Sequence, residues 1–341
     1  MSRLLIDNIG LLASGDLAEP RLQADSLLIE DAAIAQIGGR PHVDEHLDAG
    51  GGLVCPGFWD AHHYAFFGDY APLSESRGYL EASVRCGVTS AVSVGAAHLP
   101  GRPRDALGGT QLAILSTRSW AVERPLGLKM LAGTLIAAAR LTADDLSEAA
   151  SAGVTCLSFL DEVPGAPELA QLAGAKGFRI VAEAPVAEGV SADVILSVNG
   201  TRTHPGLDDT EVGRFLNRSN PMLVLSATGS LKRAVEIATR FPLDRLTLGS
   251  AQPDRVGVRP DAIPSMIELL VGFGNLDPCR AIALASGNAA RAYAQRGGVI
   301  RVGAPADLLL ASTTSGSDVV RDLADGQRLR IQHVFIDGAI S

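Results

Sequence analysis

Residues 53–64 hold the side chains best suited to chemistry in this chain of 341 residues. A Pro-Gly turn leads there into an apolar run that ends in an Asp-x-His pattern. Side chains two apart on a strand point the same way, so His62 and Tyr64 are expected to share one face. His63 is displaced by one residue and is expected to point to the opposite face. An imidazole at the end of a strand can act as a general acid or base, which makes His62 the first candidate catalytic residue.

These side chains need further strands whose ends meet at the same edge. Between residues 57 and 290, short apolar or β-branched runs alternate with amphipathic stretches. Such alternation is typical of βα units, and seven or eight units in series predict an α/β fold with a (β/α)8 TIM-like barrel over residues 56–296. Catalytic residues of such barrels lie at the carboxyl ends of the strands. The predicted strands are 90–94, 127–130, 154–160, 179–184, 193–198, 222–226 and 245–249.

Both ends of the chain are rich in predicted strands. The simplest arrangement is a small β-sandwich domain that residues 1–55 and 297–341 form together, with antiparallel pairing in its N-terminal part. One helix is expected to begin after Thr142, an N-cap residue followed by acids in the first turn. A second helix is expected over residues 276–296. The terminal strands are predicted at 4–9, 26–30, 33–37, 303–311 and 333–340.

Residues 56–64, with the sequence PGFWDAHHY, resemble the PGFxDxHxH signature of the amidohydrolase superfamily. Residues 297–308 resemble the GxIxxGxxADL segment of the same superfamily, and residues 68–72 and 98–105 resemble stretches of its enamidase-like branch. The chain is therefore identified as a member of that branch. The resemblance implies hydrolysis of C–N bonds in cyclic amides or enamides, with one or two metal ions that polarise the carbonyl group and activate a water.

The resemblance also implies metal ligands at particular strand ends, and most of them are missing. Family members use two histidines after the first strand, a bridging Glu or carboxylated Lys after the fourth, histidines after the fifth and sixth, and an Asp after the eighth. His62 stands at the first position, and the others hold Tyr64, Phe159, Glu183, Ser197 and Ala251. A divalent site generally needs at least three protein ligands, so no ligand set is assigned and at most one zinc or iron ion is expected. Such an ion would have to recruit Glu183, Asp161, Glu162, Asp254 or His204.

Three functions remain open at this point. The chain can be a non-catalytic or regulatory subunit that pairs with an intact homologue, and the loss of several ligands together favours this interpretation. It can also be an active enzyme in which His62, Glu183 and Tyr64 form a rebuilt acid–base site for hydrolysis, ring-opening or isomerisation of a small cyclic amide. Third, the protein can be one that binds such a molecule without catalysing a reaction. The substrate contacts are expected from the segments shared with the enamidase-like branch, namely His98, Arg102, Tyr70 and Asp69.

Composition excludes several classes of partner. The net charge is −9 and the basic residues are scattered, so neither nucleic acid nor a membrane surface is an expected partner. No apolar window is long enough to cross a bilayer, and the N-terminus reads as a strand rather than a signal peptide. These features predict a cytoplasmic protein, and the family resemblance implies a homo-oligomer or a hetero-oligomer with a homologous subunit. Free thiols in a reducing compartment are expected for Cys55, Cys86, Cys156 and Cys279.

Overall fold

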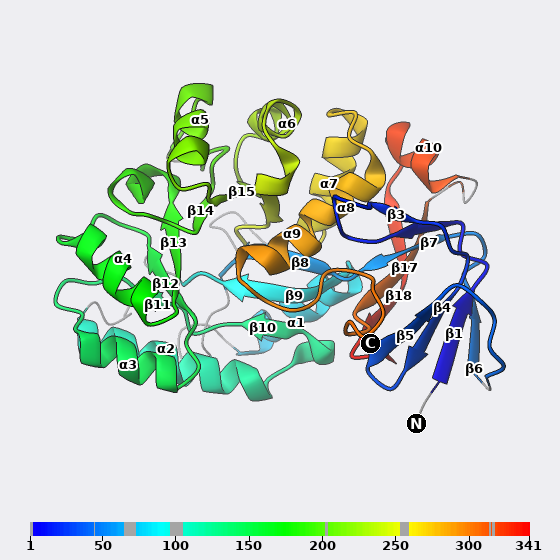
Figure 1. The fold of residues 1–341 in the computed structure, drawn as a ribbon, viewed down its shortest axis with the longest axis horizontal. Helices are drawn as coiled ribbons and strands as arrows, with labels where there is room; N and C mark the ends of the chain where they lie inside the picture. Colours follow the sequence, from blue (N-terminus) through cyan, green and yellow to red (C-terminus); the bar gives the residue numbers. More distant parts are fainter. Residues whose placement is uncertain are drawn as a thin grey trace.

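The computed structural model describes residues 3–43, 45–64, 73–95, 105–201, 204–252, 259–313, 315 and 318–341. In Figure 1 a central group of strands is surrounded by helices on one side of the molecule, and the strands from the two chain ends lie together on the other side. The predicted positions of the central strands are confirmed to within about two residues at each end, which is the usual uncertainty of strand limits.

Two parallel sheets form the central part. The first has the order β10 (Lys129–Leu131), β9 (Val88–Ser93), β8 (Phe58–His63). The second has the order β11 (Leu135–Ile136), β12 (Cys156–Phe159), β13 (Arg179–Glu183), β14 (Val194–Leu196), β15 (Met222–Ser226), β16 (Leu246–Gly249). The ends of β16 and β8 are joined because Ala251 N donates to His62 O at 2.7 Å and Tyr64 N donates to Gln252 O at 2.8 Å. This arrangement is an α/β fold of the TIM-barrel type.

The central strands bury side chains on both faces. Along β15, Met222 and Val224 belong to one apolar cluster, whereas Leu223 and Leu225 belong to another that also contains the buried faces of the helices. This division follows from the two-residue period of a strand, and it explains why these strands are continuous apolar runs rather than alternating ones. At one end of the first cluster, Tyr293 Oη donates to Ala61 O at 2.6 Å.

The helices lie around the parallel strands (Figure 1). The N-cap predicted at Thr142 is confirmed: its side chain accepts from Asp145 N, and the Asp145 side chain accepts from Thr142 N, which is a capping box. The helices that connect or follow the strands are α1 (Leu73–Arg85), α2 (Ala106–Val122), α3 (Ala143–Ser151), α4 (Ala166–Ala175), α5 (Asp209–Arg218), α6 (Leu231–Arg240) and α7 (Ala262–Gly272). Short 3-10 turns occur at Pro125–Gly127, Ala184–Gly189 and Leu243–Arg245.

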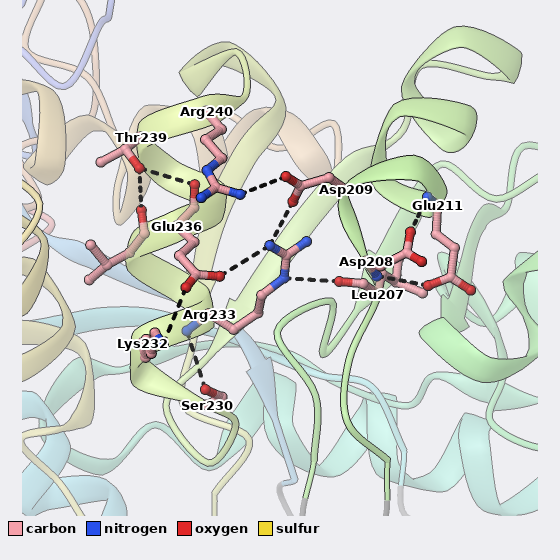
Figure 2. A network of polar contacts seen from close by, with 11 residues as sticks. Leu207, Asp208, Asp209, Glu211, Ser230, Lys232, Arg233, Glu236, Thr239 and Arg240 are labelled. Carbon is pink, nitrogen blue, oxygen red and sulfur yellow. Dashed lines mark hydrogen bonds and ion pairs between the residues drawn. The ribbon is translucent and has the colours of Figure 1, made fainter.

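Charged side chains connect α5 to α6 on the surface (Figure 2). Asp209 accepts from Arg233 and from Arg240, both at 2.7 Å, and Arg233 Nε also donates to Leu207 O at 2.9 Å. Glu236 completes the group at 3.3 Å from Arg233. Single exposed ion pairs contribute little, but this shared set fixes the two helices that follow β14 and β15 relative to each other.

The single helix expected over residues 276–296 is wrong, because the structure divides it into α8 (Pro278–Leu284) and α9 (Gly287–Ala292). At the break, Ser286 Oγ donates to Ile282 O at 2.8 Å, and the freed Ala285 carbonyl accepts from Trp59 N at 2.7 Å. A Cβ at Gly287 would lie 2.3 Å from Gly15 O, so the close approach of another segment decides the bend. Local sequence carries no signal for that contact.

The strands from the chain ends form two further sheets. One has the order β5 (Ala33–Ile37), β4 (Leu27–Glu30), β1 (Arg3–Asp7), β6 (Glu45–Asp48). The other has the order β19 (Ala339–Ile340), β18 (Leu329–Ile336), β17 (Leu308–Thr313), β7 (Leu53–Pro56), β2 (Leu11–Ala13), β3 (Arg21–Leu22), so segments from the two ends share a sheet. The antiparallel pairing expected near the N-terminus is found between β1 and β4 and between β4 and β5, but β1 pairs with β6 and β2 pairs with β7 in parallel. A short helix, α10 (Val319–Ala324), follows β17.

An ion-pair group joins the terminal sheets to the central strands. Lys129 Nζ, on β10, lies 2.7 Å from Asp307 Oδ2 and 2.6 Å from Asp337 Oδ1. Asp307 is 6% exposed, so its carboxylate depends on these partners. None of the described helices has both the length and the apolar character that crossing a membrane requires. All four cysteines are free, and Cys86 is only half-buried.

Candidate active site

His62 ends β8 and is completely buried, with 0% of its surface exposed. Its Nδ1 lies 3.2 Å from Ser226 Oγ at the end of β15, and its Nε2 lies 2.9 Å from Tyr64 Oη. A Cβ at Gly249 would lie 2.4 Å from the His62 Cβ, so β16 needs glycine beside this ring. The prediction that residues 62 and 64 share a face is therefore confirmed.

Glu183 ends β13 and faces His62. Its Oε1 lies 3.8 Å from His62 Nε2, and its side chain is 14% exposed. Its Oε2 is buried and has no hydrogen-bond partner within the part of the chain that the structure describes. Burial raises the pKa of Glu183 to about 7, against hydrogen bonds from Ser197 and Tyr64 that lower the pKa.

The neighbours of Glu183 respond differently to burial. Burial lowers the pKa of His62 to about 4, although the Asp60 carboxylate opposes this shift. Burial and the charge of Glu183 raise the pKa of the Tyr64 hydroxyl well above its usual range. At neutral pH, His62 is therefore neutral, Tyr64 keeps its proton, and Glu183 is divided between its acid and its carboxylate. A carboxyl group in this state can give or take a proton near neutral pH.

Asp60 and His63 form a separate buried group behind the site. His63 Nδ1 lies 3.3 Å from Asp60 Oδ2, and its ring stacks on Tyr79 with 5.4 Å between the ring centres. His63 therefore points away from Glu183, as its odd position in the strand predicts. Asp60 also accepts from Ser250 N at 2.8 Å and from His62 N at 3.2 Å, so its carboxylate holds the ends of β8 and β16 together.

Small or apolar side chains occupy three positions where the superfamily pattern expects ligands. Phe159 is 1% exposed in the core at the end of β12, and Ser197 Oγ lies 3.4 Å from Ser226 Oγ. Ser197 and Ala251 both have left-handed backbones, with φ of 53° and 51°. A non-glycine residue pays on the order of 1 kcal/mol or more for this conformation, so the site keeps a strained backbone at these two strand ends.

The residues present do not fit the metal pair of the superfamily. No group of three His, Cys, Asp or Glu side chains that could hold an ion occurs among the described residues. Within the described ranges, His62 and Glu183 are the side chains of this kind at the site, and Nε2 of His62 already contacts Tyr64 Oη. Three protein ligands are the usual minimum, so these two side chains do not make up a metal site.

The structure brings together His62, Tyr64 and Glu183, the three predicted catalytic residues. It does not bring Asp161, Glu162 or His204 to them. The two acids are exposed beyond β12, and His204 Nδ1 accepts from Gly206 N in a turn. The predicted substrate contacts and one candidate ligand lie outside the described residues: His98, Arg102, Tyr70, Asp69 and Asp254.

Sequence reasoning missed Ser226, Ser250 and the structural role of Asp60. Ser226 is the last residue of a correctly predicted strand and lies 164 positions after His62 in the sequence. Its hydroxyl group shares a hydrogen bond with the His62 ring. The usable signal was its place at the carboxyl end of that strand, where side chains of all the parallel strands meet. Ser250 follows β16 in the same way.

Parallel strands that end in convergent polar groups at one edge are typical of the TIM-barrel type of fold, and comparisons with known proteins agree. The chain is 32% identical to enamidase of Eubacterium barkeri over 368 aligned residues, which cover 99% of this chain and 95% of that protein. A crystal structure of enamidase, described as a member of the amidohydrolase superfamily, matches with a TM-score of 0.90 and 30% identity over 99% of this chain and 95% of the other.

Two less similar proteins share sequence or fold with this chain. Imidazolonepropionase of Mycolicibacterium smegmatis is 27% identical over 92% of both chains. N-acetyl-D-glucosamine-6-phosphate deacetylase of Mycobacterium smegmatis shares the fold, with a TM-score of 0.65 and 18% identity over 100% of this chain and 99% of the other. No protein-family model matches the chain.

The scaffold and these relatives place this chain among the C–N hydrolases of the amidohydrolase superfamily. Within that superfamily, the chain belongs to the enamidase family. Its metal-ligand pattern departs from the superfamily pattern within the described residues.

Proposed function

We propose that this protein is an acid–base enzyme that acts on a small cyclic amide or enamide without the metal pair of its superfamily. The observation that carries the proposal is the Glu183 carboxyl group, which has a buried, unpartnered Oε2 and lies 3.8 Å from the imidazole of His62. A buried carboxyl oxygen without a partner is costly, and a substrate N–H or C–H group that meets it would offset this cost. Relatives named enamidase and imidazolonepropionase support a ring that contains an amide.

Glu183 is the group that moves the proton. In its neutral form, the carboxyl group transfers its proton to the β-carbon of a cyclic enamide, and the electron pair of the ring double bond forms the new C–H bond. The resulting acyliminium cation is paired with the Glu183 carboxylate. Return of the ring N–H proton to the carboxylate completes an isomerisation to the cyclic N-acylimine. If water adds to the cation instead, one proton of that water passes to the Glu183 carboxylate and a hydroxylactam forms. The ring opens when the C–N bond of the hydroxylactam breaks, because the nitrogen takes up a proton with the electron pair of that bond and the hydroxyl group loses its proton to become an aldehyde.

His62 acts through its neighbours, because a fully buried ring cannot touch a substrate. It contacts Tyr64 Oη at 2.9 Å and Ser226 Oγ at 3.2 Å, and so fixes the direction of the Tyr64 hydroxyl beside Glu183. Tyr64, which is partly exposed, keeps its proton. When the Glu183 carboxyl group is protonated, the Tyr64 hydroxyl turns from Glu183 and donates to the substrate carbonyl oxygen. Asp69, Tyr70, His98 and Arg102 remain the proposed substrate contacts.

Proton exchange tests this proposal directly. A six-membered cyclic enamide is incubated with the protein in D2O, and NMR follows deuterium at the β-carbon. The wild-type protein should catalyse the exchange, and Glu183→Gln should lower the rate by about 100-fold or more, the usual contribution of a general acid. Glu168→Gln, an exposed substitution in the first turn of α4, is the matched control and should leave the rate unchanged. Equal rates for Glu183→Gln and wild type would exclude Glu183 as the acid.

A metal-dependent route is tested in the same assay. Dialysis against a chelator should leave the exchange rate unchanged, and elemental analysis of untagged protein should give less than one equivalent of zinc or iron per chain. At most one divalent ion is compatible with the donor set at His62 and Glu183. A rate that falls on chelation and returns with zinc or iron would contradict the metal-independent mechanism.

The second candidate is a non-catalytic or regulatory subunit that pairs with an intact homologue. The observation that favours it is the replacement of expected ligands by Tyr64, Phe159, Ser197 and Ala251, whose side chains cannot together hold the metals of the superfamily. In this case the wild-type protein binds the enamide but exchanges no proton at any pH. Rescue or stimulation of a purified intact homologue by this chain would then establish the regulatory role.

We also propose a domain architecture and a cellular location for this protein. We take the two parallel sheets as a closed (β/α)8 barrel over residues 56–296, supported by the hydrogen bonds between the ends of β16 and β8. Residues 1–55 and 297–341 form the β-sandwich domain, supported by the sheet in which β7 pairs with β17. The four free cysteines support a cytoplasmic location.

A further inference from the structure

Helix α2 carries an exposed apolar stripe that nothing in the described structure covers. Leu107 is 64% exposed, Leu115 is 49% exposed and Val122 is 81% exposed. With Gln111 and Arg118, they recur at spacings of four, four, three and four, which places all five on one face of the helix. The stripe runs about 22 Å along the helix axis, at about 1.5 Å per residue.

The charges around this stripe are few and of opposite sign. Arg118 is the one charged residue within the 17 residues of α2, and it makes no ion pair or hydrogen bond to any described residue. Beside the stripe, Glu148 of α3 is exposed and accepts from Gln111 Nε2 at 2.8 Å. Figure 1 shows α2 and α3 next to each other at the outer edge of the molecule, where a second protein can approach. The stripe therefore combines apolar side chains, a free cation and a carboxylate.

The order of these residues makes the stripe complementary to itself. If a second α2 lies antiparallel to the first, Leu107 faces Val122 of the second copy and Gln111 faces Arg118 of the second copy. Leu115 then meets its own equivalent next to the two-fold axis. Arg118 of each copy comes beside the Gln111 amide and the Glu148 carboxylate of the other, so apolar side chains meet apolar ones and the cation meets polar or acidic groups.

We propose that this protein forms a two-fold symmetric homodimer through antiparallel contact of its α2 helices, with Arg118 of each copy paired to Glu148 of the other. A second copy fits this surface because one element supplies both halves of the charge pair in the correct register. The contact uses no residue of the polar group around His62 and Glu183, so it does not depend on the proposed function. A contact of one helix from each copy is small, and the dimer is expected to dissociate on dilution.

Sedimentation velocity of the full chain, from about 1 to about 200 µM, tests the dimer. The apparent mass of the wild-type protein should rise with concentration from the monomer mass of 35.4 kDa to about twice that value. Leu115→Glu places two carboxylates next to the axis and should raise the dissociation constant by about tenfold or more, equivalent to about 1.4 kcal/mol. Phe273→Glu, at a side chain that is 79% exposed at the end of α7, is the matched control and should leave the dimer intact.

A charge exchange tests the register itself. Arg118→Glu and Glu148→Arg should each weaken the dimer, because each places like charges together across the interface. The double variant restores opposite charges and should recover the wild-type dissociation constant to within about threefold. Circular dichroism checks that these surface variants remain folded. A monomer at every concentration, a dimer that Leu115→Glu leaves unchanged, or a double variant that fails to recover would each overturn the proposal.

Discussion

Replacement of Glu183 by glutamine should change how the stability of this protein depends on pH. Below pH 4.5 the Glu183 carboxyl group is protonated in both the folded and the unfolded chain. Between pH 4.5 and about 7, the unfolded chain loses this proton while the folded chain keeps it. The folded state binds more protons in that window, so the free energy of unfolding falls as the pH rises, and the loss is complete above about pH 7.

The size of the effect follows from the shift in pKa. A rise from 4.5 to about 7 corresponds to a loss of about 3 kcal/mol, at 1.36 kcal/mol per pKa unit. His62 has the opposite effect, because burial lowers its pKa from 6.5 to about 4 and the unfolded chain then binds the extra proton. Its contribution to stability is regained as the pH rises from about 4 to 6.5. In the wild-type protein the two effects cancel between pH 4.5 and 6.5.

Glu183→Gln removes one side of this balance. The variant should gain about 3 kcal/mol relative to wild type between pH 4.5 and 8, and the two proteins should be nearly equal at pH 4.5, where Glu183 is neutral. Urea unfolding at pH 4.5, 5.5, 6.5 and 8 measures the difference, in which all other titrating groups cancel. A difference between variant and wild type that changes by less than about 1 kcal/mol over this range would refute the buried, neutral carboxyl group on which the acid–base mechanism depends.

Three further substitutions test the frame around the site. Thr142→Ala removes the capping box of α3 and should lower the free energy of unfolding by about 1 kcal/mol in urea titrations. Lys129→Met leaves the buried carboxylate of Asp307 without its cation and should cost about 3 kcal/mol in the same titration, with no loss if the pair is only a surface contact. Gly249→Ala puts a methyl group 2.4 Å from the Cβ of His62, and differential scanning calorimetry should show a loss of about 1–3 kcal/mol together with slower proton exchange.

Period-two patterns gave the most reliable part of the prediction. The same-face placement of His62 and Tyr64, and the opposite direction of His63, follow from a single strand. They are confirmed by the 2.9 Å contact of His62 with Tyr64 and by the stacking of His63 on Tyr79. The positions of the parallel strands were equally accessible, because a buried strand is a short apolar run. Glu183 was found because the superfamily resemblance expects a histidine at its position on the fifth predicted strand.

Contacts between segments that lie far apart in the sequence could not be predicted from these local patterns. The break between α8 and α9 depends on the approach of Gly15 to Gly287, and the partner of the His62 Nδ1 atom is Ser226 on another strand. Parallel pairing of β1 with β6 also requires knowledge of which strands become neighbours. None of these features produces a periodic pattern in the local sequence. Each depends on packing between segments that come together only when the chain folds.

Residue types and their spacing predicted the class of fold and the edge at which the polar side chains meet, and the superfamily resemblance showed which ligand residues are missing from the strand ends. These properties depend on residue type and spacing along one element. Only the tertiary structure decided that the Glu183 carboxyl group lies 3.8 Å from His62, that its Oε2 is left without a described partner and that its pKa is raised to about 7. The physical reason is that the energy of a charge depends on burial and on neighbours from other strands, which spacing along the chain does not encode.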